Sequence, residues 1–299
     1  MKNTAQKLKY TALGIVRAIA LLIIWSFIEP RFLNTENETA TIPNLPDSWE
    51  GKKIAQLTDF QIGLWGDNRG TARRSVAKII EAKPALVLIS GDFIYHPGKN
   101  IVPEINTAVD IVRPLVEAGI PTYAVLGNHD YGMSSRKAEP KTAEAKYLET
   151  ELEAAGVEVL ENEAVQLPLA DGNEPLYLVG VGSLWANRDD AGQALSTLPD
   201  SSPRIAMMHN PDSFEQFPPN SAPLAIAGHT HGGQVRVPGF PQWSWLRFTQ
   251  KDKVYADGWA KGYGEVGNQL YVNPGIGMSI VPIRLFCPPE LTFFTLEKE

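Results

Sequence analysis

The sequence predicts an α/β fold in which helices cover the faces of a central β-sheet. Short apolar runs such as ALVLIS (85–90) are typical of strands buried on both faces, and they alternate with amphipathic segments such as TARRSVAKIIEAK (71–83). Hydrophobic residues make up 43% of the 299 residues and occur along the whole chain, which excludes a mainly disordered protein.

Residues 10–28 (YTALGIVRAIALLIIWSFI) form an apolar run with a single charge, Arg17, and are just long enough to cross a bilayer. Lysines precede the run and no small-residue cleavage site follows it. We therefore predict a single-pass anchor over residues 1–31, with the body outside the cytoplasm. A cleaved signal peptide and a buried amphipathic helix are the alternatives. Residues 32–50 are expected to be a linker to one domain at 51–299.

The elements of the body are expected in a definite order. Strands are predicted at 52–59, 85–90 and 122–127, and helices at 71–83, 104–118 and 141–155. Pro114 is expected to kink or end the second of these helices. Strand-like runs with short gaps then follow at 157–162, 164–169, 176–184, 204–209, 223–229, 269–275, 283–286 and 290–297.

Charge is distributed unevenly along the chain. The formal net charge is −7, although residues 1–31 are net basic. The remaining body is therefore strongly acidic and would repel a phosphate backbone, so we expect no nucleic-acid partner. The only cysteine, Cys287, excludes a disulfide scaffold and is expected to be a small buried hydrophobic side chain.

Polar side chains lie at or just beyond the C-terminal ends of the predicted strands. They are Asp59, Asp92, Asn128, His209 and His229. In open α/β sheets these strand ends form the ligand crevice. Carboxylate, amide and imidazole groups together suit Mn²⁺, Fe²⁺ or Zn²⁺. The pattern therefore predicts a divalent metal site built from segments that are distant in the sequence.

Five short motifs contain these residues: TDFQ (58–61), GDFIYH (91–96), GNHD (127–130), MMHN (207–210) and GHTHGGQ (228–234). In this order they resemble the calcineurin-like metallophosphoesterases, which share D-x-H, G-D, G-N-H-[DE], a lone histidine and G-H-x-H. The last motif and the tail NPGIGMSIVPIRLFCPPELTFFTL are similar to the membrane-associated YkuE-type subgroup, which also contains UDP-diacylglucosamine pyrophosphatases. The resemblance implies a four-layered α/β/β/α sandwich.

The resemblance also implies a centre of two divalent metal ions. Asp92 would bridge the ions, because one carboxylate offers two oxygens. The other implied ligands are Asp59, Gln61 and His231 for the first metal, and Asn128, His209 and His229 for the second. His129 would protonate the leaving oxygen or stabilise its charge. Asp130 would orient His129 or a metal ligand.

Gln61 departs from the family pattern, which has a histidine in this position. An amide oxygen is a weaker ligand than an imidazole nitrogen. Three outcomes are open: a loosely held first metal, a harder ion such as Mn²⁺, or a site for one metal. Gln61 also motivates the alternative that the chain is a metal-deficient binding module.

We therefore expect a membrane-anchored, metal-dependent phosphoesterase, with Mn²⁺ favoured and Fe²⁺ or Zn²⁺ possible. Its expected substrate is a phosphodiester or pyrophosphate with a lipid or sugar-nucleotide part. A phosphodiesterase or phosphomonoesterase for soluble substrates is the alternative within enzymes. The sequence leaves the oligomeric state open.

Several further residues have less specific interpretations. Arg236 and Arg284 are candidates for holding a substrate phosphate or for surface ion pairs, and His96 is expected at the rim of the site. The aromatic, glycine-rich stretch 238–268 could form a substrate wall or a membrane-facing lip. Its tryptophans and Trp65 are nevertheless expected to pack in the interior.

Overall fold

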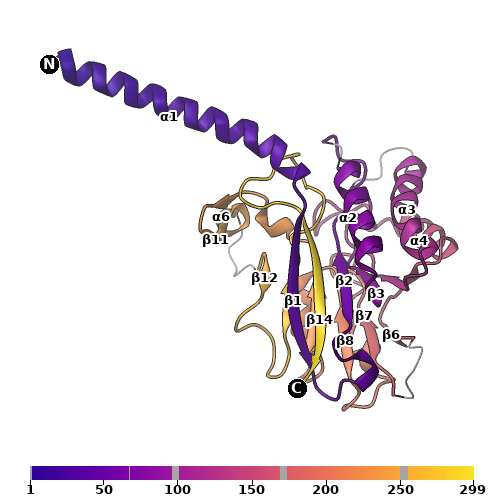
Figure 1. Ribbon diagram of the computed structural model, residues 1–299. Helices are drawn as coiled ribbons and strands as arrows, with labels where there is room; N and C mark the ends of the chain where they lie inside the picture. The colour runs from indigo at the N-terminus through magenta and orange to yellow at the C-terminus, as the bar shows by residue number, and fades with distance from the viewer. Residues whose placement is uncertain (1, 67, 96–100, 169–173, 250–254) are drawn as a thin grey trace.

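The structure is a computed structural model that describes residues 2–66, 68–95, 101–168, 174–249 and 255–299. The described residues form two six-stranded sheets with helices on their outer faces (Figure 1). Apolar side chains from both sheets share one buried cluster, so the sheets pack face to face. This confirms the predicted four-layered α/β/β/α sandwich.

The first sheet holds the N-terminal half of the site. Its strands, in spatial order, are β1 (Asn34–Ile42), β14 (Glu290–Lys298), β2 (Lys53–Leu57), β3 (Leu86–Ile89), β4 (Thr122–Ala124) and β5 (Glu158–Val159). Strands β2 to β5 are parallel, whereas β14 is antiparallel to β2. The carboxyl ends of β2, β3 and β4 therefore meet at one edge.

The second sheet supplies the histidine motifs. Its strands, in spatial order, are β12 (Gly258–Trp259), β13 (Leu270–Val272), β9 (Leu224–Ala227), β8 (Arg204–Met207), β7 (Tyr177–Gly180) and β6 (Glu163–Gln166). Strands β7, β8, β9 and β13 are parallel. A separate hairpin of β10 (Arg236–Val237) and β11 (Phe240–Ser244) follows the last histidine motif.

Helices cover the outer faces of both sheets. Those of the body are α2 (Arg69–Ala82), α3 (Val102–Glu117), α4 (Thr142–Ala154), α5 (Ala191–Leu195) and α6 (Trp245–Thr249), with 3-10 turns η1 (Glu29–Arg31), η2 (Asp47–Trp49), η3 (Pro211–Gln216) and η4 (His231–Gly233). Helices α2, α3 and α4 pack on the first sheet. Helix α5 and η3 pack on the second.

Alternating side chains fill the layers on the two sides of each sheet. In β3, Leu86 and Leu88 face the second sheet, whereas Val87 and Ile89 face the helices. This is the two-residue period of a strand, and every one of these side chains is buried. Both faces of the strand are therefore apolar, as the continuous run 85–90 predicted.

The prediction of a linker was wrong for residues 34–42. They form β1, which pairs in parallel with β14 from Asn34 opposite Glu290 to Ile42 opposite Lys298. Because β1 is an edge strand with most of its side chains at least partly exposed, its sequence NTENETATI remains polar. Thr35, Thr39 and Thr41 favour a strand, because threonine is β-branched, although the polar character of the segment suggested a linker.

Two smaller expectations also differ from the structure. Helix α3 continues through Pro114 to Glu117, so the predicted end at Pro114 is wrong, whereas the alternative of a kink stays a prediction. Residues 283–286 form no named strand and make only one isolated bridge, between Leu285 and Val235. Their loop instead packs around the buried guanidinium of Arg284.

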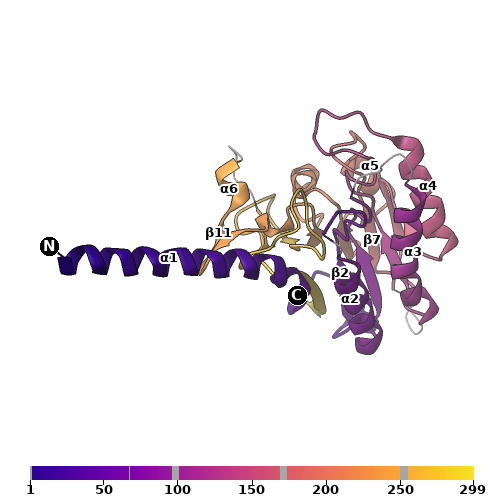
Figure 2. The same cartoon turned by 90° about the horizontal axis from the view of Figure 1, so that it is seen from above.

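Helix α1 (Lys2–Ile28) projects from the body as a long separate rod (Figures 1 and 2). An 18-residue window within the segment Gln6–Arg31 has a mean hydropathy of 2.2, and the segment is long and apolar enough to span a bilayer. Its last turn is tied to the body, because Glu29 accepts hydrogen bonds from the backbone amides of Phe286 (3.0 Å) and Cys287 (2.6 Å). That it spans a membrane stays a prediction.

Candidate metal centre

The predicted ligands lie on tight turns that follow the strands. Asp59, Gln61, Asp92 and His231 have φ angles of 54°, 52°, 58° and 50°, in the left-handed region. This conformation costs about 1–2 kcal/mol for a residue with a Cβ. Strained backbone of this kind clusters at functional sites, where the surrounding fold holds the side chain in a required direction.

Four side chains from both sheets converge on one point. The Nε2 atom of His209 lies 3.2 Å from Oδ2 of Asp92, 3.2 Å from Oδ1 of Asn128 and 3.3 Å from Nδ1 of His229. Each residue thus presents one donor atom to the same small space. This is the set implied for the second metal.

Neighbouring backbone carbonyls fix the orientation of two of these ligands. The Nδ2 atom of Asn128 donates to the carbonyl of Met133 (2.9 Å), which leaves its oxygen directed inward. The Nδ1 atom of His209 lies 2.7 Å from the carbonyl of Ser90, which leaves Nε2 for a metal. Such outer partners are typical of metal ligands in proteins.

The first-metal set lies beside the second and shares Asp92 with it. The Nε2 atom of His231 is 3.4 Å from Oδ1 of Asp59 and 3.4 Å from Nε2 of Gln61. Within the described residues, Asp59 Oδ1 and Gln61 Oε1 are buried and accept no hydrogen bond. A divalent cation would satisfy the oxygen of Asp59 directly, and that of Gln61 once its amide turns, because Nε2 of Gln61 faces Asp92 and His231. The donor set therefore fits a metal.

Glycines allow the backbone to pack directly against the carboxylates. A Cβ on Gly127 would lie 2.1 Å from Oδ1 of Asp92, and a Cβ on Gly228 would lie 2.5 Å from Oδ2 of Asp59. Any side chain at these positions would push a predicted ligand out of place.

Burial and charge shift the pKa values of the cluster in opposite directions. Burial raises the pKa of Asp59 to about 7, and the charge of Asp92 adds to this effect. Burial opposes ionisation of Asp92 as well, but His209 and His129 lower its pKa below the usual range. Burial would lower the pKa of His209, yet Asp92 raises it to about 9. Metal binding at this cluster would therefore release protons.

His129 lies on the wall of the cavity above the two clusters. Its backbone amide donates to Oδ1 of Asp92 (2.9 Å), and its ring stacks on Tyr95 with centroids 4.9 Å apart. The cavity has a volume of about 240 Å³ and is also lined by Trp185 and Ile280. The imidazole of His129 therefore borders the same cavity as the ligands Asp92, Asn128, His229 and His231 of the two predicted sets.

Asp130 is fully buried and binds backbone amides instead of lining the cavity. Its Oδ2 accepts from the amides of Asp92 (2.9 Å) and Gly127 (2.8 Å), and its Oδ1 accepts from Ile94 (3.2 Å). It joins the loops that follow β3 and β4. Of its two predicted roles, the geometry favours positioning a metal ligand, Asp92.

The interpretation of Arg284 as a phosphate-binding residue was wrong. Its guanidinium is fully buried and donates to the backbone carbonyls of Pro274, Gly275, Gly277 and Cys287. Arg236 instead pairs with Asp257 at 2.8 Å. Cys287 is buried, as predicted. His96 lies outside the described residues.

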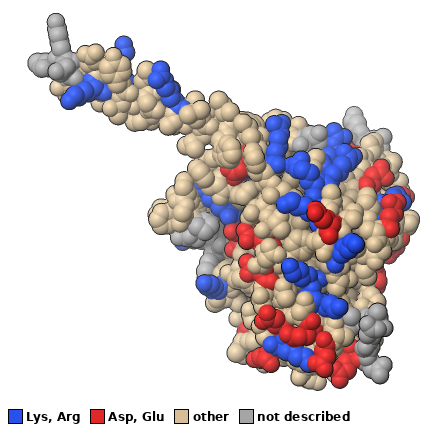
Figure 3. Space-filling view, viewed as in Figure 1, with Lys and Arg blue, Asp and Glu red and all other residues tan. Residues whose placement is uncertain are grey.

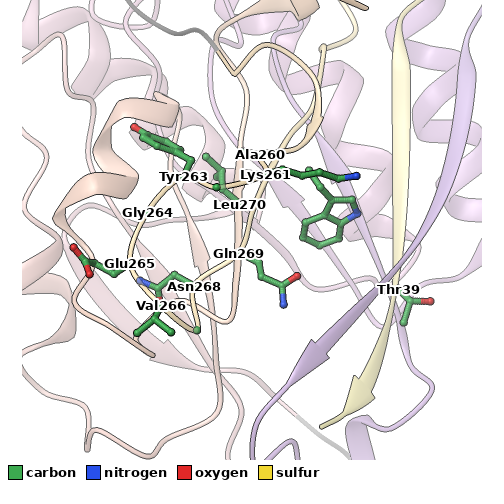
Figure 4. A pocket seen from close by; sticks show the side chains of 13 residues that line it. Thr39, Ala260, Lys261, Tyr263, Gly264, Glu265, Val266, Asn268, Gln269 and Leu270 are labelled. Carbon is green, nitrogen blue, oxygen red and sulfur yellow. The ribbon is translucent and has the colours of Figure 1, made fainter.

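Sequence reasoning missed Tyr95 and Trp185, which line the cavity. Tyr95 lies within the GDFIYH motif, and Trp185 follows the end of β7 by five residues. The rule that strand ends form the site could therefore have identified both. A second, more open hollow of about 550 Å³ lies along loop 259–270 beside Thr39 (Figure 4). No predicted site residue lines it.

The fold and the paired Asp/His clusters define a metal-dependent phosphoester hydrolase. The chain belongs to the calcineurin-like phosphoesterase family, whose model matches residues 52–233. This confirms the family resemblance and the prediction of an enzyme.

Curated relatives agree with the subgroup resemblance. The chain is 29% identical to the uncharacterized metallophosphoesterase YkuE of Bacillus subtilis (strain 168), over 91% of this chain and 88% of that protein. It is 35% identical to the phosphodiesterase YaeI of Escherichia coli (strain K12), over 74% of each. It is 24% identical to the UDP-2,3-diacylglucosamine pyrophosphatase LpxG of Chlamydia trachomatis, over 93% of each.

Proposed function

We propose that this chain hydrolyses a phosphodiester or pyrophosphate bond in a substrate with a lipid or sugar-nucleotide part. The observation that carries the proposal is the pair of clusters that share Asp92 beneath one cavity, with His129 on the cavity wall. The relatives YaeI, a phosphodiesterase, and LpxG, a UDP-2,3-diacylglucosamine pyrophosphatase, support the same substrate classes.

Different residues of the chain would have different roles in the reaction. Bound divalent ions would supply positive charge and would lower the pKa of a water molecule toward neutral pH. The first set (Asp59, Gln61, Asp92, His231) and the second set (Asp92, Asn128, His209, His229) would hold them. His129 would donate a proton to the leaving oxygen or stabilise its charge, with Tyr95 holding the ring in place. Asp130 would keep the backbone of Asp92 in position.

The proposed centre contains two ions, with Mn²⁺ favoured over Fe²⁺ and Zn²⁺. Asp59, Gln61, Asp92 and Asn128 all offer oxygen, and oxygen-rich sites favour harder ions. The first set would hold three oxygen ligands and a single imidazole, whereas the second set includes two imidazoles. We therefore expect the first set to bind its ion less tightly.

A metal-deficient binding module is the second candidate, and Gln61 is its only support. Against it, the remaining implied ligands are of the expected type and converge in two clusters. Burying the carboxylates of Asp59 and Asp92 destabilises the fold unless a cation compensates their charge. Hydrolysis of soluble phosphoesters is the alternative within enzymes, and a comparison of vesicle-borne with soluble esters separates the two.

Two variants and two esters test the proposed chemistry. Asp92→Ala should lose bound metal and turnover together, because both sets share this carboxylate. His129→Ala should keep its metal and lose about 10²–10⁴-fold in turnover of an alkyl phosphodiester. On a nitrophenyl diester, whose leaving group needs no proton, the loss should be much smaller.

Metal content by mass spectrometry and initial rates with added Mn²⁺ give the readouts. Lys146→Ala, at an exposed ion pair with Glu149 on α4, is the control and should behave as wild type. An equal loss on both esters would remove His129 from the acid role. Full metal occupancy without turnover of any ester would favour the binding module.

A further inference from the structure

Large apolar side chains are exposed on two segments, 240–245 and 280–286, and each segment contributes one residue to the lining of the catalytic cavity. We call this set the apolar rim, and it comprises Phe240, Trp243, Trp245, Ile280, Val281 and Phe286. The prediction that Trp65, Trp243 and Trp245 pack in the interior was wrong, since they are 72%, 54% and 60% exposed. Trp259 does pack, with its ring nearly perpendicular to those of Tyr271 and Phe294. Two rim residues, Trp245 and Ile280, also line the cavity.

The apolar rim is continuous with the end of the candidate membrane helix. Glu29, directly after α1, accepts from the indole of Trp25 (2.6 Å) and from the backbone amide of Phe286. The backbone amide of Arg284 donates to the carbonyl of Ser26 (2.9 Å). In both views the hairpin β10–β11 and α6 project from the body on the side toward which α1 extends (Figures 1 and 2).

Two rim residues have a strained backbone conformation although their side chains are exposed. Ile280 has a φ of 65° and is 73% exposed, and Phe286 has a φ of 56° and is 39% exposed. A β-branched or bulky residue in this region is a genuine outlier. Interior packing does not account for an exposed apolar side chain held in this way.

Basic side chains lie on the body close to the base of α1. Arg31, Arg69, Arg73, Arg74 and Lys78 are all exposed. Arg74 donates to the carbonyl of Arg31, which places the start of α2 beside the end of α1. Figure 3 shows several Lys and Arg side chains on the upper part of the body, toward α1, and the densest group of Asp and Glu side chains at its lower end. Basic groups beside apolar and aromatic ones suit an anionic lipid surface.

We propose that the apolar rim lies in the interfacial layer of the bilayer that α1 enters, so that the catalytic cavity opens at the level of the lipid headgroups. Aromatic side chains are stable at this depth, because the ring is apolar and the indole nitrogen can still donate. The inference rests on the proposed membrane anchorage. It adds a second membrane contact, made by the catalytic domain itself.

The depth of introduced spin labels tests the proposal in the full-length chain. The only native cysteine is buried, so a cysteine placed on the surface can be labelled selectively. Val281→Cys and Trp243→Cys probe the rim. Val266→Cys is the matched control, because Val266 is 73% exposed on the loop of the second hollow, which no rim residue lines.

The proteins are reconstituted in vesicles of phosphatidylethanolamine and phosphatidylglycerol, and mass spectrometry verifies that residues 1–31 are present. Oxygen enriches in the bilayer and a nickel chelate stays in water, so their relaxation effects report depth. Labels at 281 and 243 should collide more with oxygen than with nickel, and the label at 266 should show the reverse. An aqueous signal from both rim labels would overturn the proposal.

A hydrolysis assay keeps this inference separate from the proposed function. Val281→Asp should reduce turnover of a phosphoester held in the vesicles about tenfold or more relative to turnover of a water-soluble ester, and Val266→Asp should not. Buried rim labels without turnover of any lipid ester would support the rim and contradict the lipid substrate. Turnover of a lipid ester with aqueous rim labels would contradict the rim alone.

Discussion

The side-chain nitrogen of Gln61 donates a hydrogen bond to Oδ2 of Asp92 over 2.7 Å, which joins the residue that departs from the family pattern to the carboxylate proposed to bridge the two metals. The amide oxygen of Gln61 is buried and accepts no hydrogen bond within the described residues. Ligation through this oxygen requires the amide to turn and the bond to Asp92 to break. Asn128 needs no such change, because the carbonyl of Met133 already fixes its amide.

We therefore expect Gln61→His to tighten the weaker metal site. Imidazole is the stronger ligand, and histidine tolerates the left-handed backbone found at this position. The Mn²⁺ concentration for half-maximal activity should fall about tenfold or more, with little change in the rate at saturation. Titrations of activity against Mn²⁺ for wild type and variant give the measurement. Superimposable curves would mean that residue 61 does not touch the metal.

Asp130→Asn should weaken metal binding without affecting the proton-transfer step. The carboxylate accepts from three backbone amides, and an amide group can replace only one of its two oxygens as an acceptor. We expect a loss of about 10–100-fold in metal affinity. The rate ratio between an activated and an alkyl ester should stay at the wild-type value.

Asp212→Asn, at an exposed ion pair, is the control for Asp130→Asn. The effects of Asp130→Asn and His129→Ala should differ, because His129→Ala changes the rate ratio between the two esters at constant metal content. A change of the ester ratio in Asp130→Asn at full metal occupancy would assign this carboxyl a role in catalysis.

The proposed membrane anchor predicts where the full-length chain is found in cells. If residues 10–28 span the membrane uncleaved, the full-length protein should stay in membranes after salt and carbonate washing. A reporter fused after Glu299 should be active only outside the cytoplasm, because the lysines precede the apolar run. A soluble chain that begins after Ile28 would show a cleaved signal instead.

Much of the metal centre was predictable, because its residues follow strands in short motifs. Asp59, Asp92, Asn128, His209 and His229 were placed at strand ends, and the parallel strands bring those ends together. The left-handed backbone of Asp92 was not predictable, because nothing in its side chain demands that conformation. It follows from the surrounding loops, including the amides that Asp130 accepts.

Features that depend on long-range partners were missed. The polar stretch 34–42 becomes a strand only because β14, from the far end of the sequence, pairs with it. Arg284 looks like a surface residue in the sequence, but four backbone carbonyls of residues 274–287 enclose its guanidinium. In both cases the structure depends on hydrogen bonds to backbone groups. Every residue has such groups, so the sequence contains no side-chain pattern that would reveal these bonds.

A buried carboxyl outside the five motifs predicts how stability depends on pH. Glu290, at the start of β14, is buried, and its Oε1 accepts hydrogen bonds from the hydroxyls of Tyr271 (2.8 Å) and Thr292 (2.7 Å). Burial raises the pKa of Glu290 from 4.5 to about 7, and the charge of Asp257 adds to this effect. Between these two pH values the folded chain therefore keeps a proton that the unfolded chain has lost.

The free energy of unfolding should consequently fall as the pH rises from 4.5 to about 7, and the loss should persist above this window. The contribution of this one group is about 3 kcal/mol at most. Glu290→Gln stays neutral and still accepts both hydroxyls, so its unfolding free energy should vary less with pH. The variant should also be more stable than wild type above pH 7.

Urea unfolding of the full-length chain in detergent micelles, with a chelator to remove metal linkage, gives the measurement. Glu297→Gln, an exposed residue of the same strand, is the control and should keep the wild-type pH dependence. Comparing variants removes the contribution of the other titrating groups, which are common to all three proteins. Parallel curves for wild type and Glu290→Gln would mean that Glu290 is ionised in the folded protein, with a counter-charge supplied by a neighbouring group.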